Sequence, residues 1–226
     1  MVKKGDTLVE VALAIGIFSM VAIAVVAVMN TGMSNAQTAL ETTLTREEID
    51  TQAEALRFIQ VSAAAENTEN GKFSKLWSEI IKNALQPADL KNNDPDLLSN
   101  VYQFAPSSCD ALYGDNSLIK KQKAFFIDPK KLNDDSLNDS FFSYAEASKS
   151  NSFRSAEGYP RIYYNEDNTA VAEGIFVVAV KDATGTKILG DNGEGFFYDF
   201  YIRTCWRDSG SDGPSTISTV IRLLGK

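Results

Sequence analysis

The stretch Lys3-Lys4-Gly5-Asp6-Thr7-Leu8-Val9-Glu10, followed by the apolar run from Val11 to Met29, decides the organisation of the chain. The run carries no charged residue, and at the rise of an α-helix it spans roughly 29 Å, close to the hydrocarbon thickness of a bilayer. The sequence therefore predicts a membrane-spanning helix over residues 6–29. The side chains expected to form this anchor are Val11, Leu13, Ile15, Phe18, Val21, Ile23, Val25 and Val28.

The flanking charges predict how this helix is oriented. Lys3 and Lys4 precede the run, and basic flanks stay in the cytoplasm, so we expect the N-terminus inside and the rest of the chain outside. A cleaved secretory signal fits poorly, because its apolar core is normally about 7–15 residues. A generic signal anchor fits better but does not explain Glu10, since a carboxylate at the membrane end of a helix is costly unless it meets a cation.

The order Lys-Gly-Asp-Thr-Leu-Val-Glu that ends at Glu10 resembles the class III signal of type IV pilins and type II secretion pseudopilins. The resemblance implies that prepilin peptidase cuts after Gly5, which removes residues 1–5 as a leader and leaves Asp6 as the new N-terminus. It also implies that Glu10 meets the N-terminal amine of a neighbouring subunit during assembly. The chain departs from the family at Asp6, where phenylalanine is usual and where the amine is methylated.

The resemblance implies a structural subunit, a pilin or minor pilin, of a type IV pilus-like surface filament. Its partners are then prepilin peptidase, other pilin subunits contacted through the N-terminal helix, and the cytoplasmic membrane before assembly. A pseudopilin of a type II secretion or DNA-uptake machine shares the same anchor. A membrane-anchored binding protein or adhesin that does not polymerise is the alternative from another class.

Composition limits the remaining functions. The chain has 226 residues, with 22 Lys and Arg, 30 Asp and Glu, and no histidine. The charges of residues 1–29 cancel, so the net charge of −8 belongs to residues 30–226, and an acidic head argues against bulk nucleic-acid binding. The missing histidine removes the usual general base and the commonest zinc ligand. We expect no enzymatic activity and no cofactor, and the ligand of the head is not identified by sequence.

Residues 30–66 are predicted to continue the helix as an amphipathic stem. Two apolar stripes follow one another along it: first Met33, Ala36, Leu40 and Leu44 on one face, then Ile49, Ala53, Leu56 and Ala63 on another. This switch suits a lower half that packs on neighbouring helices and an upper half that packs on its own head. Two interruptions remain open, a cap near Gly32 and a break at Thr43–Thr45.

Residues 67–226 are predicted to form the globular head of an α+β fold. The apolar spacing from Phe73 to Ala84 predicts a short amphipathic helix with a buried Trp77. Runs rich in β-branched and aromatic residues predict an antiparallel sheet of about four strands at about 161–224. These strands are Ile162–Tyr164, Gly174–Val180, Phe196–Trp206 and Thr216–Leu224, with two further short candidates at Val101–Phe104 and Ala124–Ile127.

The two cysteines, Cys109 and Cys205, fit a disulfide outside the cytoplasm better than a metal site, with two buried free thiols as the alternative. Such a bridge would close a loop of about 100 residues and restrict the unfolded chain by roughly 4–5 kcal/mol. The acidic turns Asn133–Asp139 and Asp191–Glu194 lack the spacing of an EF-hand, so solvated turns are favoured over calcium sites.

Overall fold

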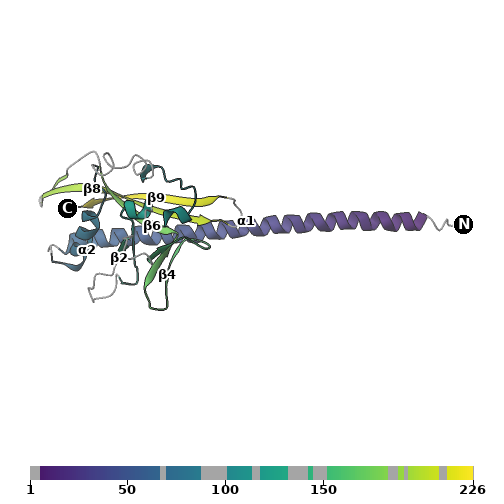
Figure 1. Ribbon diagram of the computed structural model, residues 1–226, viewed down its shortest axis with the longest axis horizontal. Coiled ribbons are helices and arrows are strands. Elements are labelled where there is room, and N and C mark those ends of the chain that lie inside the picture. Colours follow the sequence, from purple (N-terminus) through teal and green to yellow (C-terminus); the bar gives the residue numbers. More distant parts are fainter. Residues whose placement is uncertain are drawn as a thin grey trace. The chain divides into compact units, whose positions relative to one another are not determined.

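The computed structural model describes residues 6–66, 70–87, 101–113, 118–131, 142–144, 152–182, 188–190, 193–208 and 213–225 (Figure 1). The chain divides into two units, Met1–Leu40 and Glu41–Lys226. A long N-terminal apolar helix and a head with an antiparallel sheet confirm the predicted α+β class.

Helix α1 runs from Asp6 to Ala65 without interruption. It passes through Gly32 and Thr45, so the favoured continuous stem is confirmed and neither of the two alternative interruptions occurs. Thr45 is an interior helix residue, because its hydroxyl donates to the carbonyl of Glu41 at 2.7 Å, four residues earlier. This bond satisfies the hydroxyl within the helix and leaves it unavailable for capping a new one.

The second apolar stripe of the stem lies in the core of the head. Ile49, Ala53 and Leu56 are buried in the core of the head, together with Ile59, which the predicted stripe did not include. Ala63 packs partly against the same core. The switch of stripe therefore coincides with the start of the head unit near Glu41.

The main sheet of the head is antiparallel and follows the order β2-β1-β6-β8, with β7 and β9 also paired to β8. Four of the predicted strands are confirmed here. The bounds are β1 Phe125–Ile127, β2 Phe142–Tyr144, β6 Ile175–Lys181, β7 Ile188–Gly190, β8 Gly193–Arg207 and β9 Pro214–Gly225.

Strand β8 presents different side chains to the two faces of this sheet. Tyr198, Phe200 and Ile202 point into the core, where the ring of Phe200 lies 5.6 Å from that of Trp77. Arg203 and Cys205 belong to the alternate set of side chains, yet both are buried. The sheet is therefore covered on both faces here, which explains why β6 is apolar almost throughout instead of alternating.

Residues 101–113 form the second covering layer. The guanidinium of Arg203 donates to the carbonyl of Val101 and lies 5.0 Å from the centroids of the Phe104 and Tyr201 rings. Tyr102 packs edge-on against Tyr201. Burial lowers the pKa of Arg203 to about 10, so the guanidinium stays charged at neutral pH.

The predicted strand at Val101–Phe104 is wrong, because Val101 and Tyr102 are helical and the two residues that follow are not in a strand. The side chains of residues 101–104 pack onto the face of the main sheet, and this contact favours a compact turn over an added edge strand. Two short helices that the sequence did not predict also lie in this region. They are the 3-10 helix η1 at Asp110–Leu112 and α5 at Leu118–Lys121.

A second, smaller sheet has the order β3-β5-β4, with β3 at Phe153–Arg154, β4 at Arg161–Tyr164 and β5 at Ala170–Glu173. The run Ile162–Tyr164 is thus a strand as predicted, but it does not join the main sheet. Strand β5 was not predicted, because its apolar residues run almost directly into β6.

Gly174 separates β5 from β6 and lets them enter different sheets. Its φ is +68°, and a Cβ there would lie 2.6 Å from the Cβ of Ala156 and 2.7 Å from the carbonyl oxygen of Cys205. A side chain at this position would meet both steric overlap and an unfavourable backbone conformation. Glycine is therefore required where the chain passes from one sheet to the other.

Helix α2, Lys72–Lys82, confirms the predicted amphipathic helix, although it ends before Asn83 and so before Pro87. Its buried residues include Trp77, in agreement with the predicted core role. The N-cap Gly71 has no side chain, and the carboxylate of Glu66 replaces it by accepting from the backbone N–H groups of Phe73 and Ser74 at 3.1 and 2.8 Å. The end of α1 thus caps the start of α2.

Candidate functional site

The N-terminal part of α1 exposes apolar side chains in every direction. Each described side chain from Leu8 to Met29 is exposed, and Phe18 and Met20 are each 75% accessible. The most apolar stretch has a mean hydropathy of 2.8 and no residue buried within the structure. A helix that is apolar all round needs an apolar environment, so this segment is long and apolar enough to cross a membrane.

Every predicted anchor residue lies on this exposed segment of α1. These residues are Val11, Leu13, Ile15, Phe18, Val21, Ile23, Val25 and Val28. The hydroxyls of the run are satisfied locally: Ser19 donates to the carbonyl of Ile15 at 2.8 Å, and Thr31 donates to that of Ala27 at 3.1 Å. The segment can therefore enter hydrocarbon without leaving these side-chain donors unpaired.

Glu10 lies in the second turn of α1 and is exposed. No other charged residue follows it before Glu41, a distance of roughly 45 Å along a helix. The uncharged part of α1 is thus longer than the apolar run, because neutral side chains continue from Asn30 to Leu40. Glu10 is thus the charged residue that directly precedes this neutral segment.

The predicted processing site falls partly outside the described residues. Gly5 is not among them, and Asp6 begins α1 without a described side chain. The backbone from Asp6 onwards is helical, so Glu10 and Asp6 are one helical turn apart on the same helix.

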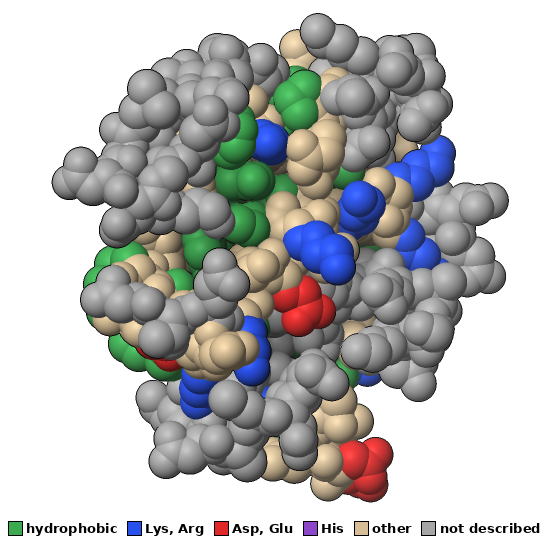
Figure 2. Space-filling view, turned by 90° about the vertical axis from the view of Figure 1, so that its left-hand side faces the viewer, with side chains coloured by type: hydrophobic (Ala, Val, Ile, Leu, Met, Phe, Trp, Pro, Cys, Tyr) green, Lys and Arg blue, Asp and Glu red, His purple; other side chains and the backbone are tan. Residues whose placement is uncertain are grey.

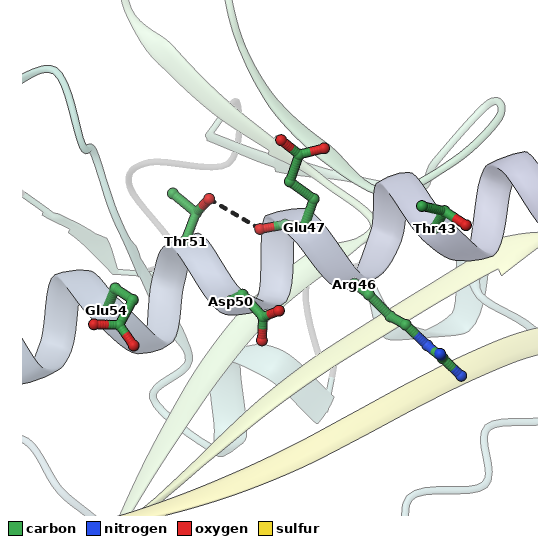
Figure 3. A pocket seen from close by; sticks show the side chains of 6 residues that line it. All are labelled: Thr43, Arg46, Glu47, Asp50, Thr51 and Glu54. Atoms are coloured by element: carbon green, nitrogen blue, oxygen red, sulfur yellow. Dashed lines mark hydrogen bonds between the residues drawn. The ribbon is translucent and has the colours of Figure 1, made fainter.

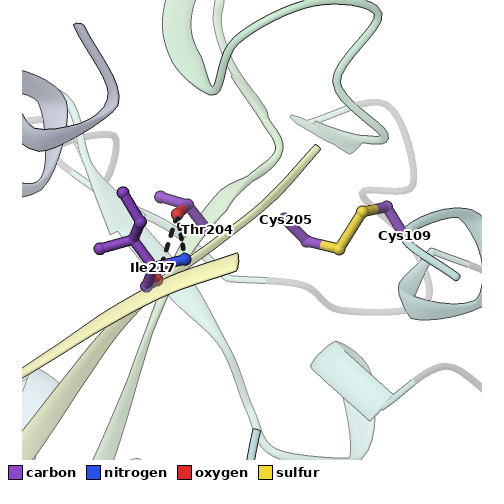
Figure 4. The surroundings of a disulfide bond; sticks show 4 residues. All are labelled: Cys109, Thr204, Cys205 and Ile217. Carbon is purple, nitrogen blue, oxygen red and sulfur yellow. Dashed lines mark hydrogen bonds between the residues drawn. A yellow bond between two sulfur atoms is a disulfide. The ribbon is translucent and has the colours of Figure 1, made fainter. Parts of the chain in front are cut away.

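The predicted disulfide between Cys109 and Cys205 is present, with the two Cα atoms 5.5 Å apart (Figure 4). Cys205 lies in β8 and Cys109 immediately precedes η1, so the bridge ties residues 101–113 to the face of the sheet. Arg203 anchors the same layer two residues earlier in β8. Both ties stabilise the head, and neither forms a reactive centre.

A buried carboxylate joins the three strands of the small sheet. Glu173 in β5 accepts from Nε of Arg161 at 2.8 Å, and Nε of Arg154 lies 3.5 Å from its other oxygen. Both arginines are direct register neighbours of Glu173, one on each side. The hydrogen bond raises the pKa of Arg161. This cluster is a cross-strand clamp that holds β3 and β4 to β5.

The head half of α1 has one hydrophilic face, which borders a shallow open hollow (Figure 3). Figure 3 shows that all the lining side chains come from α1: Thr43, Arg46, Glu47, Asp50, Thr51 and Glu54. Their spacing of three and four residues places them on one side of the helix. Thr51 donates to the carbonyl of Glu47 at 2.9 Å, as other threonines of this helix do. The hollow is an open surface and not an enclosed pocket.

Charges of both signs are mixed over one side of the head, with apolar groups between them (Figure 2). Among the described residues no three His, Cys, Asp or Glu side chains are placed to hold a metal ion. The acidic turns Asn133–Asp139 and Asp191–Glu194, considered for calcium, lie where no side chain is described.

Comparison of the chain with protein-family models, with curated proteins and with solved structures found no match.

Proposed function

We propose that the chain is a structural subunit, a pilin or minor pilin, of a type IV pilus-like surface filament. One observation carries the proposal: α1 is uncharged from Val11 to Leu40, its side chains there are exposed or half-buried, and the carboxylate of Glu10 directly precedes this segment. Such a helix cannot remain in water, and it has two possible environments. The bilayer covers it before assembly, and the helices of other subunits cover it in the filament.

The length of the neutral segment supports packing against the helices of other subunits. The apolar run alone matches a bilayer, but the uncharged helix continues through Met33 and Leu40, which are 67% and 59% exposed. Neither residue contributes to the core of the head. Apolar side chains at these positions suit packing against neighbouring helices, because no core of their own chain covers them.

Glu10 supplies the register for that packing. Cleavage after Gly5 would create a free amine at Asp6, and the amine of one subunit could meet Glu10 of the next inside the bundle. Each charge alone is costly in an apolar bundle, whereas the pair is compensated. The pair therefore acts more as a selector of one axial offset between subunits than as a source of net stability. Asp6 places a second carboxylate beside the amine.

The experiment compares Glu10→Ala and Glu10→Gln with the control Asp50→Ala in the native host. Asp50 is an exposed carboxylate of the same helix, within the head half. We expect both Glu10 variants to insert into the membrane at wild-type level and to yield no sheared surface filaments. The control should assemble normally. Wild-type filament yield in both Glu10 variants would contradict the proposed role of this residue.

A pseudopilin of a type II secretion or DNA-uptake machine would use the same helix in a short, piston-like assembly. Imaging of shed surface filaments, with mass-spectrometric identification of this chain in them, separates the two. Long filaments containing the chain support a pilin. Its absence from shed filaments, together with loss of secretion or DNA uptake on deletion, supports the pseudopilin.

A further inference from the structure

Strand β9, Pro214–Gly225, is the edge strand of the main sheet and pairs along its whole length with β8. The register is unbroken from Phe196 opposite Gly225 to Arg207 opposite Pro214. Apart from this ladder, no backbone hydrogen bond to β9 is formed by any described residue. Within the part of the chain that the structure describes, the other edge of β9 is therefore a long row of backbone groups without a partner strand.

The direction of the ladder identifies which groups these are. The N–H of Cys205 donates to Gly174 at 2.8 Å, on the β6 side of β8, so the backbone of Thr204 faces β9. Thr204 is opposite Ile217, and its hydroxyl bonds both the N–H and the carbonyl of that residue (Figure 4). Because the pattern alternates, the outward-facing residues of β9 are Thr216, Ser218, Val220, Arg222 and Leu224.

This edge lacks the usual protection against pairing. It has no bulge and no lysine, and its one proline, Pro214, stands at the very start. The single charge, Arg222, is held across the sheet by Asp199 through two hydrogen bonds of 2.6 and 2.7 Å. Val220 at the centre is half exposed. A long, regular and nearly neutral edge of this kind is a template for another strand.

We infer that β9 of a second copy of this chain pairs with this edge in an antiparallel sense. Length favours this partner: the other described edge strands, β2, β3, β4 and β7, contain three, two, four and three residues, so none of them can satisfy the edge of β9. A twofold axis at Val220 pairs it with its own copy, pairs Ser218 with Arg222, and pairs Thr216 with Leu224. This register uses all outward-facing residues and places no like charges opposite each other.

The inference goes beyond the proposed function, because it needs neither cleavage after Gly5 nor contacts of the apolar part of α1. Pairing through β9 joins two heads, whereas Glu10 acts in the helix. The test is therefore made in the full chain carrying Glu10→Ala, purified in detergent. A failure of the pilin proposal would leave its outcome unchanged.

The test is oxidative cross-linking of Val220→Cys. Opposite hydrogen-bonded residues have Cα atoms about 5.5 Å apart, within the reach of a disulfide. We expect a covalent dimer on a non-reducing gel. The matched control is Ser218→Cys, on the same exposed face, whose copies would be roughly 13 Å apart in this register and too distant to join. Equal cross-linking of the two variants, or none with Val220→Cys, would overturn the inference.

Light scattering on two lysine variants tests the same register independently, through the dimer fraction. Val220→Lys sets two ammonium groups opposite each other, so the dimer fraction should fall about tenfold or more, whereas Thr216→Lys, opposite Leu224, should change it by less than about threefold. Equal effects of the two lysines would contradict the register. Cross-linking of Val220→Cys in host membranes to a different protein in place of a second copy would overturn the identity of the partner.

Discussion

Replacing Gln52 by leucine should remove the connection between α1 and β1. The side-chain amide of Gln52 is fully buried and forms two hydrogen bonds with the backbone of Ile127, each 2.9 Å long, one as donor and one as acceptor. Ile127 lies beyond the point where β1 pairs with β6, at Phe125 opposite Val177. Gln52 thus pairs backbone groups of β1 that β6 does not reach.

The size of the destabilisation follows from the two backbone groups of Ile127 that the substitution leaves unpaired. Leucine is similar in size to glutamine, so packing is largely kept, and the loss comes from the N–H and carbonyl of Ile127. An unsatisfied buried group costs about 1–3 kcal/mol, so Gln52→Leu should lower the free energy of unfolding by about 2–6 kcal/mol. The matched control is Gln122, also buried, whose amide atoms have no hydrogen-bond partner among the described residues. Gln122→Leu should be neutral or stabilising.

The assay is urea unfolding of the full chain in detergent, followed by the fluorescence of Trp77 and Trp206, which are both buried. A third variant, Gln52→Glu, adds a pH test. Its neutral acid can donate to Ile127, whereas its carboxylate cannot, so the native pKa should lie above the unfolded value of about 4.3. The native state then binds the proton more tightly, and the stability of this variant should fall as pH rises through the native pKa.

Two results would refute this reasoning. If Gln52→Leu and Gln122→Leu change the free energy of unfolding equally, within about 0.5 kcal/mol, the hydrogen bonds to Ile127 do not hold α1 to the sheet. If Gln52→Glu shows the same pH dependence as Gln52→Leu, the carboxyl group is not buried against the Ile127 carbonyl.

Two further variants test how the head is held together. Glu66→Ala removes the cap of α2 and should lower the free energy of unfolding by about 0.5–2 kcal/mol. Burial opposes ionisation of Glu66, but hydrogen bonds from Phe73 and Ser74 lower its pKa, so its contribution should be present above about pH 4.3 and lost as pH falls through the native pKa. Equal stability of wild type and variant at pH 7 would contradict this role. The double variant Cys109→Ser, Cys205→Ser removes a cross-link between residues separated by 96 positions and should lower the free energy of unfolding, measured in urea, by about 4–5 kcal/mol. Alkylation of both thiols in the native, unreduced wild-type protein would show instead that the bridge is absent.

The sequence predicted those elements whose pattern is local. The apolar run of α1, the amphipathic spacing around Trp77 and the β-branched and aromatic runs of β6, β8 and β9 can each be recognised from neighbouring residues alone. The pairing of the two cysteines was also predictable, because no third cysteine competes. The burial of the upper stem followed from the switch of apolar stripe.

The misses have long-range causes. Gln52 pairs with a backbone 75 residues away, and no local pattern marks a glutamine for that role. The helical turn at Val101 forms because the carbonyl of that residue meets Arg203, which is 102 positions later. One signal was available: Arg203 and Cys205 share a face of β8, and a predicted bridge at Cys205 already required a second layer on that face. The division between β5 and β6 depended on Gly174 alone.

The most direct test of the central claim, that α1 is an assembly helix processed like that of a pilin, is the intact mass of the chain isolated from its host. The account predicts a mass reduced by that of Met1 to Gly5, with Asp6 as the N-terminal residue, with or without one added methyl group. A chain that keeps Met1 to Gly5 in membranes and in any surface assembly would contradict it.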